Sequence, residues 1–353
     1  MNLKDVKIAV YGAGAMGTIL GAFLTQGGLK NVHLITRNEA HLKGLKTKGA
    51  TIVCVAENNK EIIVPVTALS PLEMRGKYDV VFLMTKQRNN AEILNFLLPY
   101  LHEESIICTT QNGLPEEGIA EIIGNKRTYG AVTSYGASFI GEGKMALTSK
   151  FDGMSMEVGG YKNDEEKTQR LLEILSYAGK SIENAHFAKK TDNLAGARWS
   201  KLAINAAFSG LSVVTGLTFG EIAKKRKMRI LALKVLRECI DVAKALNVPL
   251  AKMQGYDMEK LLGGKTPLKR LFSYLVLPIA MKKHKKLRSG MLNDVEKGRK
   301  CEIDFIDGMV VKQGEKTGVP TPICKKIVEL VHGIENGLYE ITYQNTDFFK
   351  FDK

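Results

Sequence analysis

A glycine-rich turn directly after a short β-rich segment is the strongest constraint that the sequence places on the fold. Lys7–Tyr11 reads KIAVY, and a helix is predicted over Thr18–Gln26. In the G-x-G-x-x-G spacing between them, the first glycine permits a tight turn, the second lets the backbone approach a pyrophosphate, and the third lets the helix pack against the strand. The context of strand, turn and helix predicts a dinucleotide-binding unit, with the pyrophosphate at the helix N-terminus. The motif consists of Gly12, Ala13, Gly14, Ala15, Met16 and Gly17.

The residues that follow two other predicted strands indicate which dinucleotide would bind. Proteins that prefer NAD usually carry a carboxylate after the second strand, where it binds the ribose 2′-hydroxyl. Here Arg37 follows the apolar segment Val32–Thr36, at the position expected for that carboxylate. A guanidinium suits a 2′-phosphate, so the sequence favours NADP (as NADPH) over NAD. Lys86 follows the apolar segment Tyr78–Thr85, and it either contributes to the same anion site or is a plain surface lysine.

The first half of the chain alternates between strand-like and helix-like segments. This alternation predicts βαβ units, and therefore an α/β domain with a mostly parallel sheet and helices on both of its faces. Between Arg127 and Lys190 the segments become short, glycine-punctuated and β-rich, and we expect them to extend the same sheet with antiparallel members. The other segments expected here are the strand Ser105–Thr110 and the helices Asn90–Leu101 and Glu165–Ala178.

From about Asp192 the pattern becomes helical, so we expect a dinucleotide-binding domain over residues 1–190 and an all-helical domain over residues 191–353. Residues 251–288 contain the apolar run LFSYLVLPIAM, which we expect in a surface excursion because about 11 apolar residues cannot span a bilayer; an interfacial helix is the alternative. Thr321-Pro322 fits an N-cap followed by proline at the first helical position. The helices expected in this half are Leu194–Leu211, Arg229–Leu246, Ser289–Gly314 and residues 322–331.

The charge of the chain restricts its partners. Lys plus Arg exceed Asp plus Glu by 51 to 37, which gives a formal charge of +14. The two densest basic runs are residues 224–227 and 282–286. They have no aromatic residues among them and belong to no recognisable nucleic-acid-binding module, so solvated surfaces explain them better than nucleic-acid binding. A positive field also suits a protein whose ligands are anions.

The remaining composition is that of an intracellular globular protein. The five cysteines are far apart and form no CxxC pair, which argues against a disulfide framework and a zinc site, and the six histidines show no metal-ligand spacing. There is no signal-peptide pattern and no run of about 18 apolar residues. We therefore expect a cytoplasmic protein with no metal and no membrane association, and we leave the possibility of a homodimer open.

Three polar residues recur at helical spacing in the apolar segment that begins at Trp199. Lys201, Asn205 and Ser209 are four residues apart, so on an α-helix they share one face. A polar stripe on an apolar helix needs partners, because burying an unpaired polar group is costly. The spacing alone favours hydrogen-bonded helix packing over a catalytic role.

Four segments together resemble the 2-dehydropantoate 2-reductase (ketopantoate reductase) family. They are GAGAMG near the start, TTQNGL at residues 109–114, WSKLAINAAFSGLSVVTG from residue 199 and SGMLNDVEKGRKCEIDFIDG from residue 289. They follow the family's order and span nearly the whole chain. The resemblance implies a Rossmann domain followed by an all-helical domain, an active site in the cleft between them, and the reduction of a 2-oxo acid to a 2-hydroxy acid with NADPH.

The resemblance also implies roles for single residues. Lys201 matches the catalytic lysine of W-x-K-L, and Asn205 matches the asparagine four residues later. Asn112 matches the asparagine near the nicotinamide and the substrate, and Glu302 matches a glutamate that contacts the substrate or positions Lys201. The residues implied on the 2′-phosphate side of the cofactor are Arg37 and Lys86.

These residue types suit the implied reaction. Hydride transfer to a ketone carbon leaves negative charge on the oxygen, and a cation that also donates a proton would stabilise and neutralise it. Proton donation by Lys201 would contribute roughly 10²–10⁴-fold to the rate. Partial burial would lower the pKa of the lysine and make donation easier.

The chain departs from the family pattern on the substrate side. Ser209 stands where the family helix usually carries a second asparagine. The family's S-M-L-x-D motif is also changed, because Gly290 precedes the methionine and Ser289 lies one place earlier than the usual serine. In the family, that serine commonly contacts the substrate carboxylate. Asp294 matches the aspartate of this motif, with a structural role. The changes leave the lysine chemistry intact and put the identity of the substrate in doubt.

Three alternatives to a ketopantoate reductase therefore stay open. The first is a related NADP-dependent dehydrogenase for another 2-oxo acid, or an opine-type enzyme that joins a 2-oxo acid to an amine. The second is a non-catalytic NADP-binding sensor, against which the presence of Lys201, Asn205 and Glu302 speaks. The third is a nucleic-acid binder, which rests on the charge alone and predicts binding that weakens steeply with salt.

Overall fold

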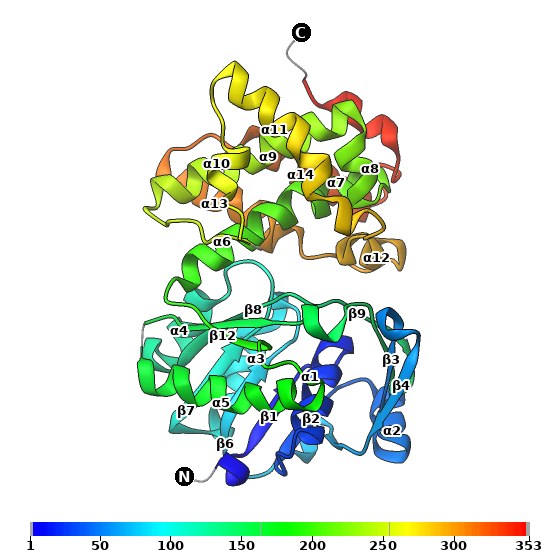
Figure 1. The fold of residues 1–353 in the computed structure, drawn as a ribbon, viewed down its shortest axis with the longest axis vertical. Coiled ribbons are helices and arrows are strands. Elements are labelled where there is room, and N and C mark those ends of the chain that lie inside the picture. Colours follow the sequence, from blue (N-terminus) through cyan, green and yellow to red (C-terminus); the bar gives the residue numbers. More distant parts are fainter. Residues whose placement is uncertain (1–2, 163, 254, 351–353) are drawn as a thin grey trace. The chain divides into compact units, whose positions relative to one another are not determined.

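The computed structural model describes residues 3–162, 164–253 and 255–350, and the chain forms two compact units (Figure 1). Unit 1 consists of Met1–Gln111 and Pro115–Leu194, and unit 2 consists of Asn112–Leu114 and Ala195–Lys353. The division thus falls after Leu194 rather than after residue 190, and it assigns a short segment near residue 112 to the helical unit. Each unit has its own hydrophobic core.

Unit 1 contains an eight-stranded sheet in the order β12-β11-β8-β7-β6-β1-β2-β5. β1 (Ile8–Tyr11) pairs in parallel with β2 (Val32–Ile35) and with β6 (Tyr78–Leu83), and all residues of β1 and β6 are buried. Only β11 (Met156–Gly160) against β8 (Thr128–Thr133) is an antiparallel pair in this sheet, among the residues described. The remaining strands are β5 (Thr67–Leu69), β7 (Leu101–Thr109) and β12 (Ala188–Lys190). The predicted α/β architecture with a mostly parallel sheet is confirmed.

Helices cover both faces of this sheet, and the alternation along β1 shows why. Ile8 and Val10 belong to the core that also holds residues of α1 and α5. Ala9 and Tyr11 point to the opposite face and belong to the core formed with α3 and α4. A strand buried on both sides must be apolar throughout, which is the pattern of its sequence. The helices are α1 (Ala15–Gln26), α3 (Asn90–Leu97), α4 (Glu116–Ile123) and α5 (Glu165–Ser181), and α2 (Glu39–Lys48) follows β2.

A second, four-stranded sheet in the order β4-β3-β10-β9 corrects the expectation that all later strands extend the first sheet. Its β10 pairs in parallel with β3, not with a strand of the large sheet. The backbone of α2 lies close to the turn between β9 and β10, since a Cβ on Gly44 would lie 2.6 Å from the carbonyl carbon of Glu142 in that turn. Helix α1 contacts both sheets. The strands are β3 (Ala50–Cys54), β4 (Lys60–Val64), β9 (Ala137–Gly141) and β10 (Lys144–Leu147).

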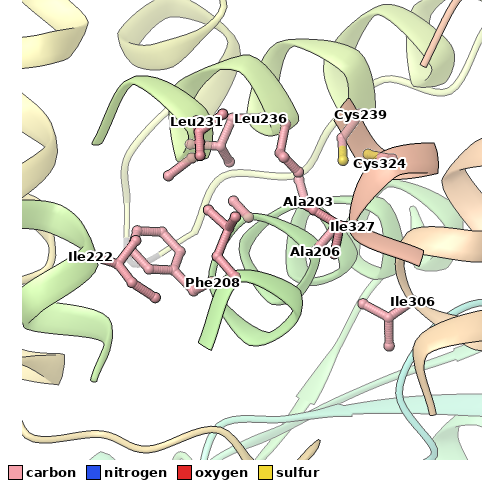
Figure 2. Packing of buried hydrophobic residues seen from close by; sticks show 14 of the residues in the cluster. Ala203, Ala206, Phe208, Ile222, Leu231, Leu236, Cys239, Ile306, Cys324 and Ile327 are labelled. Atoms are coloured by element: carbon pink, nitrogen blue, oxygen red, sulfur yellow. The ribbon is translucent and has the colours of Figure 1, made fainter. Parts of the chain in front are cut away.

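Unit 2 is helical, as predicted, and α9 (Arg226–Ala245) is its central element. This helix contacts α8, α10, α11, α13 and α14, and it buries an apolar face that includes Leu231 and Leu236. Figure 2 shows Leu231, Ala206 and Ile327, which come from three different elements, in the shared core. The other helices are α6 (Leu194–Asn205), α7 (Leu211–Thr215), α8 (Phe219–Lys224), α10 (Met258–Leu262), α11 (Pro267–Ala280), α12 (Gly290–Glu296), α13 (Asp307–Thr317) and α14 (Pro322–Glu335).

Two of the predicted helices are interrupted. The segment expected as one helix over Leu194–Leu211 contains the π-helical turn η8 (Ala206–Gly210) between α6 and α7. The helix expected over Ser289–Gly314 is also wrong as a single element, because α12 ends at Glu296 and α13 begins at Asp307. Gly298 adopts a φ of +66°, a left-handed conformation that ends α12.

The connection after α12 is held by a local ion pair. Arg299 donates from Nη2 to Asp294 Oδ1 at 2.7 Å, and the Arg299 amide donates to the Asp294 carbonyl oxygen at 2.9 Å. Asp294 therefore braces this turn through its side chain and its carbonyl oxygen. After this turn the single 3₁₀ turn η10 (Ile303–Phe305) leads into α13.

Residues 251–288 contain α10 and α11, and most of the described side chains of α11 are exposed. Thr266 caps α11 by accepting a hydrogen bond from the Lys269 amide, and Pro267 occupies its first position. Only Ser273 and Leu277 of α11 are fully buried, among its described side chains. No helix within the described residues is long and apolar enough to cross a bilayer.

Candidate functional site

The glycine-rich turn lies at the carboxyl end of β1, where the chain turns into α1. Gly12 has a φ of +99°, and a Cβ there would lie 2.6 Å from the Thr85 backbone nitrogen. A Cβ on Gly17 would lie 2.5 Å from the Gly12 carbonyl oxygen, so this glycine lets α1 pack against the turn. Gly14 differs, because a Cβ there would meet no atom within 4 Å. Two of the glycines are therefore required by the fold, and Gly14 faces open space.

The N-terminus of α1 is not capped by a side chain. Gly14 is its N-cap residue, and Ala15 and Met16 begin the first turn. The Thr18 amide donates to the Gly14 carbonyl oxygen at 2.8 Å, and the Thr18 hydroxyl donates to the Ala13 carbonyl oxygen at 3.2 Å. The first amide groups of the helix thus point into the space beside Gly14, where an anion would be stabilised by them and by the helix dipole. This arrangement fits the pyrophosphate of a dinucleotide.

Arg37 and Lys86 lie at the same edge of the sheet as the glycine turn. β1, β2, β6 and β7 are parallel, so their carboxyl ends meet at this edge. The strand order reverses at β1, which lies between β2 and β6, and ligands of such sheets bind at this switch point. Both side chains are exposed. The Arg37 Nη1 atom lies 3.8 Å from Glu92 Oε1, and an exposed pair of this kind contributes at most about 1 kcal/mol. The guanidinium can therefore exchange Glu92 for a phosphate at little cost.

Gln111 is a structural element of this edge that the sequence analysis missed. Its side chain is buried, and Nε2 donates to the Thr85 carbonyl oxygen at 2.9 Å and to Asn90 Oδ1 at 2.7 Å. Its Oε1 accepts hydrogen bonds from Asn90 Nδ2 and Thr109 Oγ1, both at 3.0 Å. The amide thus connects the carboxyl ends of β6 and β7 to the start of α3. Nothing in the segment TTQNGL distinguishes such a brace from an ordinary polar loop.

Lys201 and Asn205 lie one turn apart on α6, and both side chains are partly buried. Burial and the positive charge of Arg198 lower the pKa of Lys201 to about 7. Arg198 lies three residues before Lys201 and is only 1% exposed. The sequence does not show that this arginine turns inward, so its effect on the lysine could not be predicted. The result is an amine that exchanges its proton near neutral pH.

Ser209 lies in the π turn η8 and is buried. A π turn closes with i→i+5 hydrogen bonds, so it moves Ser209 around the helix axis from the position it would have in a continuous α-helix. π turns of this kind occur frequently at functional sites. The predicted face shared by three residues is therefore regular only between Lys201 and Asn205.

The π turn packs closely against the start of α13. A Cβ on Gly210 would lie 2.8 Å from Asp307 Oδ2 and 2.6 Å from Ile327 Cγ2, so only glycine fits there. Asp307 is fully buried, and neither of its carboxylate oxygens has a hydrogen-bond partner. Burial raises the pKa of Asp307 well above its ordinary value, and the negative charge of Glu238 adds to the effect. A buried carboxyl whose charged form is disfavoured therefore supports the turn from behind.

The other predicted residues of unit 2 lie in its connecting segments. Ser289 is buried, and its Oγ accepts a hydrogen bond from the Met291 amide at 3.1 Å, as the N-cap of α12. α12 packs against η8 and α7, which brings Ser289 to the same part of the unit as Ser209. Glu302 is partly buried and lies directly before η10, not within a helix. Asn112 is exposed and precedes Gly113, which has a φ of +81°.

Two cavities of unit 2 are separate from these residues. A groove of about 610 Å³ runs between α13 and α14, and a smaller cavity of about 340 Å³ lies between α9 and α11. None of Lys201, Asn205 and Glu302 lines either of them. The glycine turn, Arg37 and Lys86 thus gather at one sheet edge of unit 1, whereas Asn112 belongs to unit 2, whose other predicted residues lie on α6, η8 and the segments around α12.

Comparison with known proteins identifies the family. The family model described as ketopantoate reductase PanE/ApbA matches residues 8–160, and the model of its C-terminal part matches residues 193–335. A 2-dehydropantoate 2-reductase of Archaeoglobus fulgidus is 25% identical over 341 residues, which cover 95% of this chain and 100% of the relative. One of Lactococcus lactis is 27% identical over 335 residues, covering 94% and 98%.

Solved structures share the fold. A ketopantoate reductase from Ralstonia eutropha superposes with a TM-score of 0.78 at 23% identity, covering 94% of this chain and 99% of the other. A D-mandelate dehydrogenase, solved with NADH and anilino(oxo)acetate, has a TM-score of 0.77 at 24% identity with the same coverage. A ketopantoate reductase of Staphylococcus aureus, described as dimeric, has a TM-score of 0.70 at 18% identity, covering 95% of this chain and 100% of the other.

The two family models together match most of the chain in the expected order, and the relatives align over nearly their whole length. This chain belongs to the ketopantoate reductase family, and it is an oxidoreductase that acts on a CH–OH group.

Proposed function

We propose that the chain reduces a 2-oxo acid to a 2-hydroxy acid with NADPH, that Lys201 is the general acid, and that ketopantoate is the substrate to test first. The observation that carries the proposal is the pKa of Lys201, which burial and Arg198 lower to about 7. A general acid works best when its pKa lies near the working pH, because it is then both protonated and ready to give up the proton.

In this reaction the bound cofactor supplies a hydride to the carbonyl carbon of the substrate. The Lys201 ammonium donates a hydrogen bond to the carbonyl oxygen, stabilises the negative charge that develops there, and transfers its proton to it. Asn205, one turn further on α6, orients the lysine or the substrate. Glu302 accepts a hydrogen bond from a substrate hydroxyl or positions Lys201, and Asn112 contributes a polar contact near the reacting atoms.

NADPH is proposed over NADH on the residues after β2. Arg37 is exposed and only weakly paired with Glu92, at 3.8 Å. The next residue, Asn38, accepts the His41 amide at 2.9 Å as the cap of α2, so it does not compete for the ribose. A guanidinium in the place of the carboxylate that usually binds the ribose 2′-hydroxyl of NAD suits the 2′-phosphate. We assign cofactor binding to unit 1 and catalysis to unit 2.

A different 2-oxo acid is the second candidate, and Ser209 favours it. The side chain is buried in η8, where the family helix usually carries an asparagine, and Ser289 is shifted and serves as a helix cap. The D-mandelate dehydrogenase with the same fold is named for an aromatic 2-hydroxy acid, which supports a substrate other than ketopantoate. Opine-type chemistry would require an added amine. A non-catalytic sensor would not need a lysine of lowered pKa.

We also propose a homodimer, by likeness to the S. aureus enzyme described as dimeric. Light scattering of the purified chain measures the mass directly, and a mass of one chain would contradict this part of the proposal.

The first experiment mixes purified protein with NADPH and ketopantoate and follows the absorbance of the reduced nicotinamide, with NADH in parallel. Lys201→Ala is compared with Lys316→Ala, a matched change of an exposed lysine in α13. Activity that prefers NADPH, is kept in Lys316→Ala and disappears in Lys201→Ala supports every part of the proposal.

Other outcomes separate its parts. NADPH binding without turnover of ketopantoate would keep the cofactor and send the search to other 2-oxo acids, with and without an amine. An unchanged rate in Lys201→Ala would remove the lysine from the chemistry.

A further inference from the structure

The cavity between α9 and α11 is lined by three arginines. Arg226 and Arg237 come from α9 and Arg270 comes from α11. Its volume is about 340 Å³, and its other walls include Leu233, Leu271 and Tyr274. Three guanidinium groups around one small cavity repel each other, so such a cluster lowers stability unless an anion joins it.

The charges of these arginines are not compensated within the protein. The Arg237 Nε atom is buried and has no hydrogen-bond partner. Burial lowers the pKa of Arg237, and the positive charge of Arg270 lowers it further. Asp241 is the carboxylate that opposes this effect, but it pairs with Lys265 at 3.0 Å. Across the described part of the chain, no carboxylate is within ion-pair distance of any of the three guanidinium groups.

Arg229, on the same helix, shows how an arginine is satisfied when its role is structural. Its Nε donates to the Ala223 carbonyl oxygen at 2.6 Å, and Nη2 donates to the Lys224 carbonyl oxygen at 2.9 Å. Its guanidinium also stacks on the Tyr274 ring, with the central carbon 4.3 Å from the ring centre. The contrast with Arg237, two turns further along α9, indicates that the cavity is arranged for a ligand and not for packing.

The rim of the cavity is apolar and exposed. Leu271 lines the cavity and is itself exposed, and α11 carries further large apolar side chains at helical spacing. Leu268 is 78% exposed, Leu275 is 58% exposed and Ile279 is 72% exposed. A stripe of this kind beside a cationic cavity suits a ligand with an anionic head and an apolar chain.

We propose that Arg226, Arg237 and Arg270 form a second anion site in unit 2, which binds the phosphate group of a phosphate ester whose apolar chain lies along α11. Phosphate is favoured over carboxylate because it carries up to two negative charges and three acceptor oxygens, enough for three guanidinium groups. The site contains no residue that we assign to catalysis or to the nicotinamide cofactor. The same head group occurs in soluble alkyl or acyl phosphates and in anionic phospholipids, so the test must separate these two sources.

The experiment uses the full chain with two probes. Dodecyl phosphate is titrated by calorimetry, with inorganic phosphate as the head group alone, and sedimentation is measured with phosphatidylcholine vesicles that contain or lack phosphatidic acid. The variants are Arg226→Gln/Arg270→Gln and Arg237→Met, which keeps the apolar stem of the side chain. The control is Lys269→Gln, which removes one positive charge from an exposed position of α11 that does not line the cavity.

We expect each arginine variant to weaken dodecyl phosphate binding at least about tenfold, and Lys269→Gln to change it less than about threefold. Without ligand, Arg237→Met should unfold at a higher temperature than the unmodified chain, because it removes an uncompensated buried charge. Vesicle binding that requires both phosphatidic acid and the arginines would identify the lipid as the source, and binding of dodecyl phosphate alone would identify a soluble ester.

Two results would overturn the proposal. One is that the unmodified chain does not bind dodecyl phosphate, or binds it no more tightly than the arginine variants do. This result is also expected if a second copy of the chain covers α11. The other is vesicle binding that survives the loss of the arginines, which would leave only the apolar stripe to explain it.

Discussion

The glycine turn of unit 1 and the α6–η8 segment of unit 2 are built on opposite principles. At the turn, function depends on the backbone, and Gly12 and Gly17 are fixed by contacts of 2.6 Å and 2.5 Å that a Cβ would make. In α6–η8, function depends on the environment of side chains, because Lys201 acquires its pKa of about 7 from burial and from Arg198. A requirement of the backbone is visible in the sequence as glycines at fixed spacing, whereas the surroundings of a side chain depend on distant residues and produce no local sequence pattern.

The two regions also differ in how they relate to stability. The glycine turn is consistent with the fold around it, so a ligand only fills space that is already there. The α6–η8 segment carries a cost, because it contains the partly buried Lys201 and the buried Arg198 and packs against the buried carboxyl of Asp307. Substitutions of Gly12 and Gly17 should therefore weaken function and stability together, whereas substitution of Lys201 should weaken function while raising stability.

The largest effect is expected at Lys201. Lys201→Met should lower the turnover number roughly 10²–10⁴-fold. The pKa of this lysine is lower in the folded chain than in the unfolded chain, so the folded state is penalised while the amine is protonated. The penalty is complete below about pH 7 and disappears as the pH rises towards the ordinary lysine value. Lys201→Met should therefore be more stable at pH 6, by up to about 4 kcal/mol, with a gap that closes at alkaline pH.

Urea unfolding at several pH values measures this gap, and the kinetic pH profile gives a second readout. Activity of the unmodified enzyme should fall above about pH 7, as the general acid loses its proton. A variant that loses activity without gaining stability in acid would mean that Lys201 is not buried in the charged form, and the contrast between the two regions would fail.

Arg37→Gln is expected to have the next largest effect. Loss of a charged hydrogen bond to the 2′-phosphate should raise the Michaelis constant for NADPH roughly 10–100-fold. The constant for NADH serves as the internal control and should stay within about twofold, since NADH lacks this phosphate. Equal changes for both cofactors would show that Arg37 acts on the fold of the turn after β2 and not on the phosphate.

Gly12→Ala and Gly14→Ala sharpen the comparison within the turn itself. A side chain on Gly12 is strained at its φ of +99° and meets the Thr85 backbone, so the free energy of unfolding should fall by at least about 1–3 kcal/mol. Gly14→Ala meets no atom, so stability should change by less than about 0.5 kcal/mol while NADPH binding weakens. Calorimetric titration with NADPH decides the second point, and unchanged binding in Gly14→Ala would place the pyrophosphate elsewhere.

The smallest effect is expected at Asp307. Its pKa is raised in the folded chain, so the unfolded chain releases this proton at lower pH, and the carboxyl destabilises the fold increasingly as the pH rises above about 4. Asp307→Asn should be about 1–2 kcal/mol more stable than the unmodified chain at pH 7, with a difference that shrinks towards pH 5. Asp304→Asn is the matched control, because Asp304 is exposed and pairs with His332 at 2.8 Å. The same pH trend in both variants would exclude burial as the cause.

The sequence was informative where a residue type is imposed by geometry. The order of strands and helices in unit 1, the glycine turn and the helical character of unit 2 all follow from spacing and apolar periodicity. The small sheet of β3, β4, β9 and β10 was missed, because β-rich segments do not specify their pairing partners. The break between α12 and α13 depends on a left-handed Gly298, which looks like any other glycine within a helical pattern.

Within the candidate site, the residues that could not be predicted are those that act through a neighbour. Gln111 braces two strand ends with its amide, and Arg198 acts on Lys201 only because it turns inward. Both lie beside motifs that were recognised. Their identity alone is typical of a loop glutamine and a surface arginine, and only the packing distinguishes them.

The π turn at Ala206–Gly210 has a consequence for how such enzymes diverge. A wide turn is equivalent to one residue inserted into a helix, held in place here because Gly210 rests on Asp307 and Ile327. Deleting a single residue inside it would restore the regular winding and rotate every later side chain of α7 by about 100°. An insertion or deletion in this one helix would therefore reposition the side chains that follow the turn, without any substitution among them.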